Sequence, residues 1–315
     1  LRQAQITSIV EDIRVWEDRD GASPVLQLRD LLEGMGLKGT RLGVEYDTHG
    51  MTGRIALDMA AHLSAFASLH DHSRLVERLR AVKSPAEIAL VRKAAALTDA
   101  AYEAALPLVE PGAREGEILA AMQGAVFAGD GDYPGNEFII GSGREALLCR
   151  YQTGRRVLGE NDQLTLEWAG AVRRYHVAAM RTVIVGKPAP RHVALHAAAR
   201  DALEAVEETL VPGRTFGDVF AAHAAAVDAR GESAHRLNAC GYSLGARFAP
   251  SWMDWPMAYR DNPAVIEPDM VIFMHMILMD SDSGAAMSLG QTYLTTQGAP
   301  ECLSKLPLDL PVKAG

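Results

Sequence analysis

The feature that most constrains the fold of this chain is a sequence echo at a spacing of about one hundred residues. Leu108-Val-Glu-Pro-Gly112 opens a helix-like stretch that runs to Gly129, and Leu210-Val-Pro-Gly213 opens another that runs to Gly231. A long apolar-periodic stretch precedes each echo, and β-rich sequence follows it. Two copies of helix, helix and sheet predict an α+β domain with pseudo-twofold symmetry. Coincidence is the alternative, because Pro-Gly pairs commonly end helices.

The N-terminal part of the chain has a different pattern. Helix-like stretches at 25–35 and 52–63 flank an extended segment at 40–46, which predicts a small α/β unit. After Ser84-Pro85, alanine-rich sequence predicts a long helix over 86–108. We therefore expect a partial N-terminal α/β domain over 1–79 and an α+β domain over 80–315.

Composition limits the classes of partner. The 315 residues include 40 acidic and 31 basic side chains, and the net charge of -9 repels phosphate backbones and anionic lipids. Nucleic acid and membranes are therefore not expected partners. The three cysteines form no C-x-x-C pair, and residues 1–11 lack the pattern of an export signal. We expect a protein of the reducing cytoplasm.

Three ionisable residues interrupt otherwise apolar strands. The segments 164–170 and 173–186 predict a β-hairpin that contains Glu167 and His176, and 270–279 predicts a buried strand that contains His275. Burial of an ionisable group costs free energy unless the group is paired or neutralised. These residues are therefore either structurally satisfied or candidates for proton transfer.

Other motifs in the sequence are weak. Gly241-Tyr-Ser243-Leu-Gly245 matches the nucleophile elbow of serine hydrolases, but Pro250 follows too closely for the helix that this motif requires. His192 and His196 have a chelating spacing without the glutamate of H-E-x-x-H, so a solvated helix face explains them better. The segment 280–284 resembles a calcium loop without its distal glutamate, and a β-turn explains it better.

The sequence resembles the creatinase, aminopeptidase P and prolidase superfamily, whose catalytic domain has the pita-bread fold. The resemblance covers essentially the whole chain and implies a real pseudo-twofold duplication. The motifs that carry it are Lys83-Ser-Pro-Ala-Glu-Ile88, Leu166-Glu-Trp-Ala-Gly170, Arg181-Thr-Val183 through Gly186, Gly241-Tyr-Ser-Leu-Gly245, Glu267-Pro-Asp-Met270 and residues 292–298.

The metallopeptidase members of that superfamily bind two metal ions with two Asp, one His and two Glu. The resemblance places these ligands on Glu167, Ala178, Tyr242, His275, and either Leu289 or Gly290. Alanine, leucine and glycine side chains offer no lone pair to a divalent cation. We therefore predict no metal and no cofactor.

The resemblance is nearest to the metal-free members, in which creatinase opens a guanidino compound and ectoine hydrolase opens a cyclic amidine. Arg174-Tyr-His176 and Pro250-Ser-Trp252 match the ectoine hydrolase branch. We expect a metal-independent hydrolase of a C–N bond in a small zwitterionic amide, amidine or guanidino compound, and a homodimer. A conventional Xaa-Pro dipeptidase and a pita-bread protein that binds a ligand without catalysis are the alternatives.

The expected residue roles follow from this chemistry. Glu167 would be the general base or a cation anchor, His275 and His176 would donate protons or orient groups, and Tyr242 would donate a hydrogen bond to developing negative charge. A histidine of the superfamily falls on Arg150, which would hold a substrate carboxylate. The residues assigned to substrate binding are Arg150, Tyr151, Trp252, Asp254 and Trp255; for the two tryptophans, packing or a dimer contact is an equal alternative.

Overall fold

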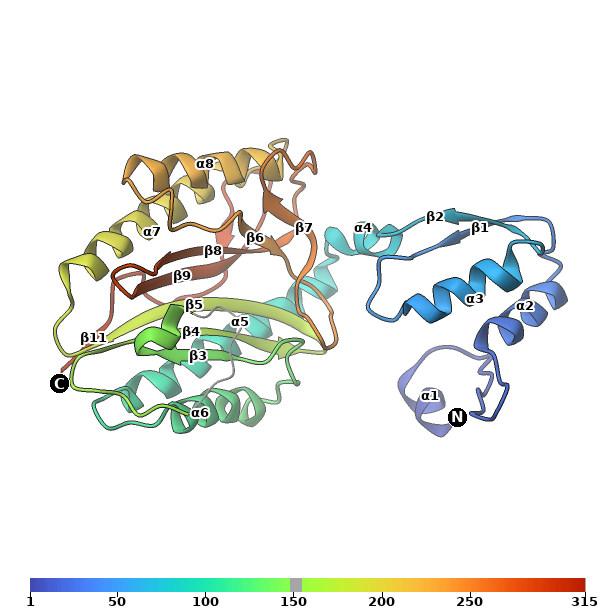
Figure 1. The fold of residues 1–315 in the computed structure, drawn as a ribbon, viewed down its shortest axis with the longest axis horizontal. Helices are drawn as coiled ribbons and strands as arrows, with labels where there is room; N and C mark the ends of the chain where they lie inside the picture. The colour runs from blue at the N-terminus through green and yellow to red at the C-terminus, as the bar shows by residue number, and fades with distance from the viewer. Residues whose placement is uncertain (148–154, 315) are drawn as a thin grey trace. The chain divides into compact units, whose positions relative to one another are not determined.

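The computed structural model describes residues 1–147 and 155–314. Its contacts group the chain into two compact units, Leu1–Leu75 and Val76–Gly315. Figure 1 traces both units along the chain. The boundary expected near Arg80 falls within α4 (Leu75–Ala81).

The first unit is a small α/β structure. It contains α1 (Arg2–Thr7), α2 (Pro24–Gly34), β1 (Arg41–Val44), α3 (Gly53–Leu63) and β2 (Ser68–Asp71), and β1 pairs in parallel with β2. Its core includes Val25, Val44, Met59, Leu63 and Phe66. The two predicted helices and the extended segment between them are confirmed, whereas β2 was not predicted.

In the described part of the second unit, nine strands form one sheet in the order β3-β4-β5-β9-β8-β6-β7, with β10 paired to β9 and β11 paired to β5. Helices α5 and α6 flank the β3–β5 part of the sheet, and α7 and α8 flank the β6–β9 part (Figure 1). The elements are α5 (Pro85–Ala105), α6 (Glu115–Ala128), β3 (Ile139–Ser142), β4 (Asp162–Val172), β5 (Tyr175–Val185), α7 (Pro190–Thr209), α8 (Phe216–Ala229), β6 (Ala239–Ser243), β7 (Asp254–Tyr259), β8 (Val271–Asp280), β9 (Ala285–Leu294), β10 (Glu301–Cys302) and β11 (Val312–Lys313), with 3-10 turns η1 (Leu106–Leu108) and η2 (Gly143–Leu147).

The pseudo-twofold duplication predicted from the echo is present in the backbone. Gly112 and Gly213 have φ angles of 84° and 86°, a region that glycine adopts without steric cost. The N–H of Gly112 donates to the carbonyl oxygen of Leu158 at 2.8 Å, and that of Gly213 donates to Ile266 at 3.0 Å. The two glycines therefore make the same turn, and each ties a helix to the segment that leads into a long strand.

The predicted hairpin is β4 and β5, which pair over their whole lengths. Its turn consists of Arg173 and Arg174, with φ angles of 49° and 68°, and Asp132 accepts a hydrogen bond from the backbone N–H of Arg174 at 2.9 Å. Helix α5 begins where Ser84 and Glu87 form a capping box, and it ends before Pro107.

Within 1–147 and 155–314, no helix is both long and apolar enough to span a bilayer.

Candidate active site

Strand register places a row of four residues across one face of the sheet. Glu167 of β4 is opposite Met180 of β5, Met180 is opposite Gly290 of β9, and Gly290 is opposite His275 of β8. Residues directly opposite each other in antiparallel strands share a face. Neighbouring strands lie about 4.8 Å apart, so Glu167 and His275 flank a floor formed by Met180 and Gly290.

A second row lies beside the first on the same face. The Ala178 N–H donates to Thr292 Oγ1 at 3.1 Å, and that hydroxyl donates to the Ala178 carbonyl at 2.8 Å. Thr292 is opposite Phe273, and Phe273 is opposite Tyr242 of β6. The five positions that the resemblance assigned to metal ligands therefore share this face, where they hold Glu167, Ala178, Tyr242, His275 and Gly290.

The register also decides between Leu289 and Gly290. Leu289 belongs to the core cluster under α7 and α8, on the opposite face from His275. A Cβ atom at Gly290 would lie 2.9 Å from the Met274 carbonyl oxygen and 3.0 Å from the Phe273 ring. Gly290 is therefore the corresponding position, and the Met274 carbonyl and the Phe273 ring leave no space there for a glutamate side chain.

A chain of hydrogen bonds connects Glu167 to the loop before β7. The indole N–H of Trp252 donates to Tyr242 Oη at 2.9 Å, and Tyr242 Oη donates to Glu167 Oε1 at 3.3 Å. The Tyr242 and His275 rings lie 5.5 Å apart between centroids. Trp252 is fully buried, and its indole N–H supports the Tyr242 hydroxyl, an arrangement in line with the packing alternative for this residue.

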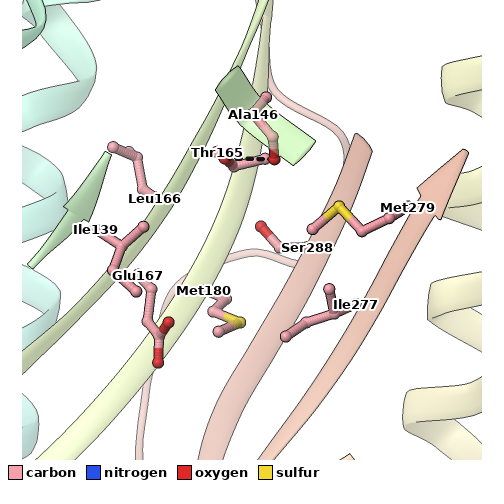
Figure 2. Close-up of a pocket in the computed structure, with 9 residues that line it drawn as sticks. All are labelled: Ile139, Ala146, Thr165, Leu166, Glu167, Met180, Ile277, Met279 and Ser288. Atoms are coloured by element: carbon pink, nitrogen blue, oxygen red, sulfur yellow. Dashed lines mark hydrogen bonds between the residues drawn. The ribbon is translucent and has the colours of Figure 1, made fainter. Parts of the chain in front are cut away.

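Figure 2 shows a small hollow beside Glu167. Large apolar side chains line it, among them Ile139, Met180, Ile277 and Met279. The centre of a water-sized sphere has about 20 Å³ to move in, which is room for about one water molecule. The carboxylate thus borders a space that suits an attacking water or a small substituent.

His176 lies two residues before Ala178 on β5, on the same face of the sheet, and the backbone holds both of its ring nitrogens. The Gly135 N–H donates to Nε2 at 2.9 Å, so Nδ1 carries the proton and donates to the Gly245 carbonyl at 3.2 Å. Burial lowers the pKa of His176 to about 4. Of the two roles expected for His176, this geometry favours orientation over proton donation, and its ring packs 6.3 Å from that of Trp252.

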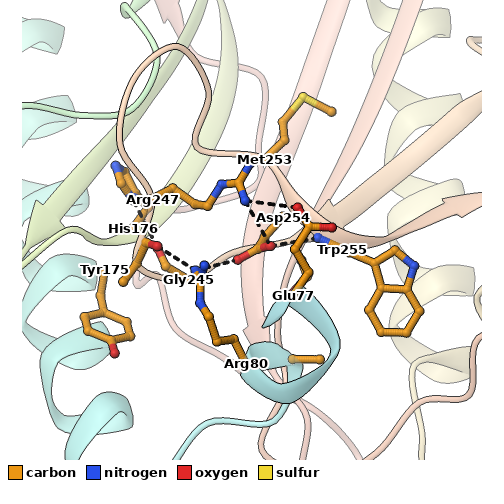
Figure 3. Close-up of polar contacts among 12 residues, drawn as sticks. Glu77, Arg80, Tyr175, His176, Gly245, Arg247, Met253, Asp254 and Trp255 are labelled. Carbon is orange, nitrogen blue, oxygen red and sulfur yellow. Dashed lines mark hydrogen bonds and ion pairs between the residues drawn. The ribbon is translucent and has the colours of Figure 1, made fainter. Parts of the chain in front are cut away.

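Asp254 and Trp255 lie in a separate charged cluster (Figure 3). Asp254 pairs with Arg80 at 2.9 Å and lies 3.6 Å from Arg247. The guanidinium of Arg78 lies 5.5 Å from the centre of a Trp255 ring. Arginine side chains of the protein therefore contact both Asp254 and Trp255, which the sequence analysis assigned to substrate binding.

Two predicted residues, Arg150 and Tyr151, lie outside the described part of the chain. Three residues that the sequence analysis did not single out are Arg80, Lys83 and Arg247. Lys83 is the first residue of a motif that carries the family resemblance, so the sequence did offer a signal for this residue. No local pattern marks the two arginines, because their shared partner Asp254 is remote from Arg80 in sequence.

The weaker motifs have structural explanations. Ser243 is fully buried on β6, donates to the Val271 carbonyl at 3.3 Å and accepts from Lys83 Nζ at 3.3 Å, so it is no exposed nucleophile. His192 is bonded to Gln163, and His196 to a backbone carbonyl, so they do not chelate together. The segment 280–284 is the turn between β8 and β9.

The residues on the face do not fit a dinuclear metal centre. Two of the five positions, Ala178 and Gly290, have no donor atom, and Tyr242 and His275 replace a histidine and a glutamate. Two divalent ions need several carboxylate oxygens to balance their charge. The described residues contain no group of three or more His, Cys, Asp or Glu side chains placed to hold a metal ion.

A duplicated α+β domain with polar residues from both halves on one face defines a pita-bread hydrolase. The model of metallopeptidase family M24 matches residues 89–297, which is more than half of the chain, and the chain belongs to this family. It is 28% identical over 301 residues to the uncharacterized hydrolase/peptidase y4tL of Sinorhizobium fredii, covering 93% of this chain and 73% of that protein. It is 27% identical over 284 residues to the ectoine hydrolase of Halomonas elongata, covering 86% of this chain and 70% of that protein.

Solved structures confirm the fold. The Xaa-Pro dipeptidase of Bacillus anthracis superposes with a TM-score of 0.85 at 21% identity, over 99% of this chain and 84% of that one. A prolidase of Thermococcus sibiricus superposes with a TM-score of 0.86 at 18% identity, over 99% of this chain and 83% of that one. The predicted pita-bread architecture is therefore confirmed.

Proposed function

We propose that this chain is a metal-independent hydrolase that cleaves a C–N bond of a small zwitterionic amide, amidine or guanidino compound. The observation that carries the proposal is the face on which Glu167, Tyr242 and His275 occupy ligand positions while Ala178 and Gly290 offer no donor. Protein acids and bases are the groups available there for proton transfer. Similarity to the ectoine hydrolase of Halomonas elongata supports the substrate class.

The proposed reaction divides proton transfer between two side chains. Water attacks the carbon of the C–N bond, and Glu167 takes a proton from that water as the C–O bond forms. The leaving nitrogen receives a proton from His275 as the C–N bond breaks. The single hydroxyl proton of Tyr242 is directed at Glu167, so Tyr242 holds the carboxylate in position.

The proposal is tested by Glu167→Gln and His275→Ala. Each variant should lower turnover at least about a hundredfold, the usual scale for loss of a general acid or base. Glu103→Gln changes an exposed glutamate on α5 and is the control for the first variant. Assays should include ectoine, creatine and prolyl dipeptides, with far-UV circular dichroism as a check of folding. Full activity in either variant would refute the assigned roles.

The alternative proposals predict different outcomes. A conventional Xaa-Pro dipeptidase would hydrolyse prolyl dipeptides only with added metal. A pita-bread binding protein would bind a ligand without turnover.

The expected homodimer and cytoplasmic location also stay proposals. The two described cysteines are free, which is compatible with a reducing compartment.

A further inference from the structure

Three cations converge on one buried carboxylate next to the active-site loop. Arg80 pairs with Asp254 Oδ2 at 2.9 Å, and Arg247 lies 3.6 Å from Oδ1. A Cβ atom built on Gly245 would lie 3.1 Å from Asp254 Oδ2, 3.4 Å from Arg80 and 3.7 Å from Lys83 Cε, so these groups meet at one point. Asp254 is buried, and its charge offsets the repulsion among the three cations.

The two arginines among these cations hold the loop between β6 and β7, residues 244–253. Arg80 on α4 also donates to the carbonyl oxygen of Ala246 at 2.5 Å. Arg247 within the loop also donates to Glu77 on α4 at 3.0 Å. Figure 3 shows this arrangement around Asp254. Helix α4 and the loop are thus joined through Asp254 and Glu77.

The loop ends beside the catalytic face. Trp252, two residues before Asp254, donates to Tyr242 Oη at 2.9 Å, and Tyr242 donates to Glu167. A displacement of the loop would therefore move the indole N–H away from Tyr242. The Tyr242 hydroxyl would then lose the donor that orients it toward Glu167.

The geometry points to Asp254 as a positioning residue that acts through Trp252 and Tyr242 on Glu167, rather than as a residue that contacts substrate. This inference deepens the proposed function, because it assumes that Glu167 is the catalytic carboxylate. Asp254 holds Arg80 and Arg247 against the loop, and the loop holds Trp252 on Tyr242. The charge of Asp254, rather than its shape, carries the effect.

The test uses Asp254→Asn, which keeps the shape and removes the charge. Asp280→Asn is the matched control, because Asp280 is similarly buried and pairs with Arg191 at 2.6 Å in the β8–β9 turn. Asp254→Asn should lower kcat at least about tenfold with KM nearly unchanged, the effect of a misplaced reacting group. Asp280→Asn should leave kcat unchanged.

A second readout does not depend on activity. The indole N–H resonance of Trp252 is assigned by its loss in Trp252→Phe, and its hydrogen exchange should be at least about tenfold faster in Asp254→Asn than in wild type or Asp280→Asn. In kinetics, Asp254→Asn should add little to Trp252→Phe, because both act through one contact.

The outcomes separate this inference from the proposed function. Unchanged indole exchange in Asp254→Asn, or additive kinetic effects with Trp252→Phe, would overturn the positioning role. An effect on KM with kcat unchanged would return Asp254 to substrate binding. Accelerated exchange without turnover of any C–N compound would support the coupling to Tyr242 while refuting the proposed function.

Discussion

At the residue scale, the account depends on which groups meet at Glu167. The superfamily motifs singled out Glu167, Tyr242 and His275, and the strand register places these three residues on one face of the sheet. The bond between Trp252 and Tyr242 could not be predicted, since it depends on the path of a loop. The pairing of Asp254 with Arg80 could not be predicted either, because Arg80 lies on a helix far from Asp254 in sequence.

Tyr242→Phe tests the hydrogen-bond chain directly. The variant removes the hydroxyl that accepts a hydrogen bond from the Trp252 indole N–H and donates one to Glu167, so the buried indole N–H loses its partner. Loss of such a buried bond should cost about 1–3 kcal/mol of stability. Turnover should fall about tenfold or more, the scale for a donor that holds a reacting group.

Tyr259→Phe is the control for this change, because Tyr259 is partly exposed at the end of β7. Steady-state kinetics and urea unfolding measure the two effects. Wild-type turnover in Tyr242→Phe would show that Glu167 is oriented by other groups.

At the element scale, His176 joins two segments that flank the face. It accepts from Gly135 and donates to Gly245, so it fixes the segment before β3 against the loop after β6. The β-branched and aromatic residues of 164–186 predicted the hairpin that carries His176, and the apolar run over 270–279 predicted β8. Strand β2 was missed, because a short edge strand with few apolar residues resembles a loop in sequence.

His176 predicts an acid-dependent loss of stability. Its pKa is about 4 in the folded chain and 6.5 ordinarily, so between these values the unfolded chain binds the proton and the folded chain does not. Stability should therefore fall as the pH drops from 6.5 to 4, by roughly 3 kcal/mol for this group.

The measurement is urea unfolding of wild type and His176→Gln across this pH range. The glutamine variant does not titrate and keeps one donor and one acceptor. Its stability should fall less steeply with decreasing pH than that of wild type. Parallel curves for the two proteins would contradict the neutral, backbone-bonded state of His176.

Burial of Lys83 should make the stability of the fold depend on pH in the alkaline range. Burial lowers its pKa to about 8 from 10.5, so the folded chain loses this proton at a lower pH than the unfolded chain. Because the unfolded chain then binds more protons, stability should rise between about pH 8 and 10.5 relative to Lys83→Met. Urea unfolding at pH 7 and pH 10 checks this; an identical difference at both values would contradict it.

At the scale of the whole molecule, the duplication explains most of what was predictable. The echo at Gly112 and Gly213 repeats the same turn in each half. Two matching short motifs were therefore enough to predict a pseudo-twofold α+β domain, without knowledge of which strands pair. The duplication also bears on the site, because each half of the domain contributes a long strand pair, β4–β5 or β8–β9, to the sheet that carries the site residues. The order of strands in that sheet could not be derived from the pattern, because pairing joins residues far apart in sequence.

The division of contacts predicts that residues 76–315 fold without the first unit. This unit contains its own large apolar clusters, and Leu1–Leu75 has a separate core around Leu63 and Phe66. A chain of residues 76–315 should unfold in one cooperative transition, followed by circular dichroism. A gradual transition without cooperativity would show that the second unit depends on the first.

The most direct test of metal independence is the metal content of the active, full-length protein, measured by inductively coupled plasma mass spectrometry after purification without chelators, together with turnover before and after treatment with EDTA. Because Ala178 and Gly290 provide no ligands, we predict well below one Mn, Co, Zn or Fe ion per chain and unchanged turnover of a C–N substrate. Near-integral metal, with turnover that disappears on chelation and returns on metal addition, would contradict the account.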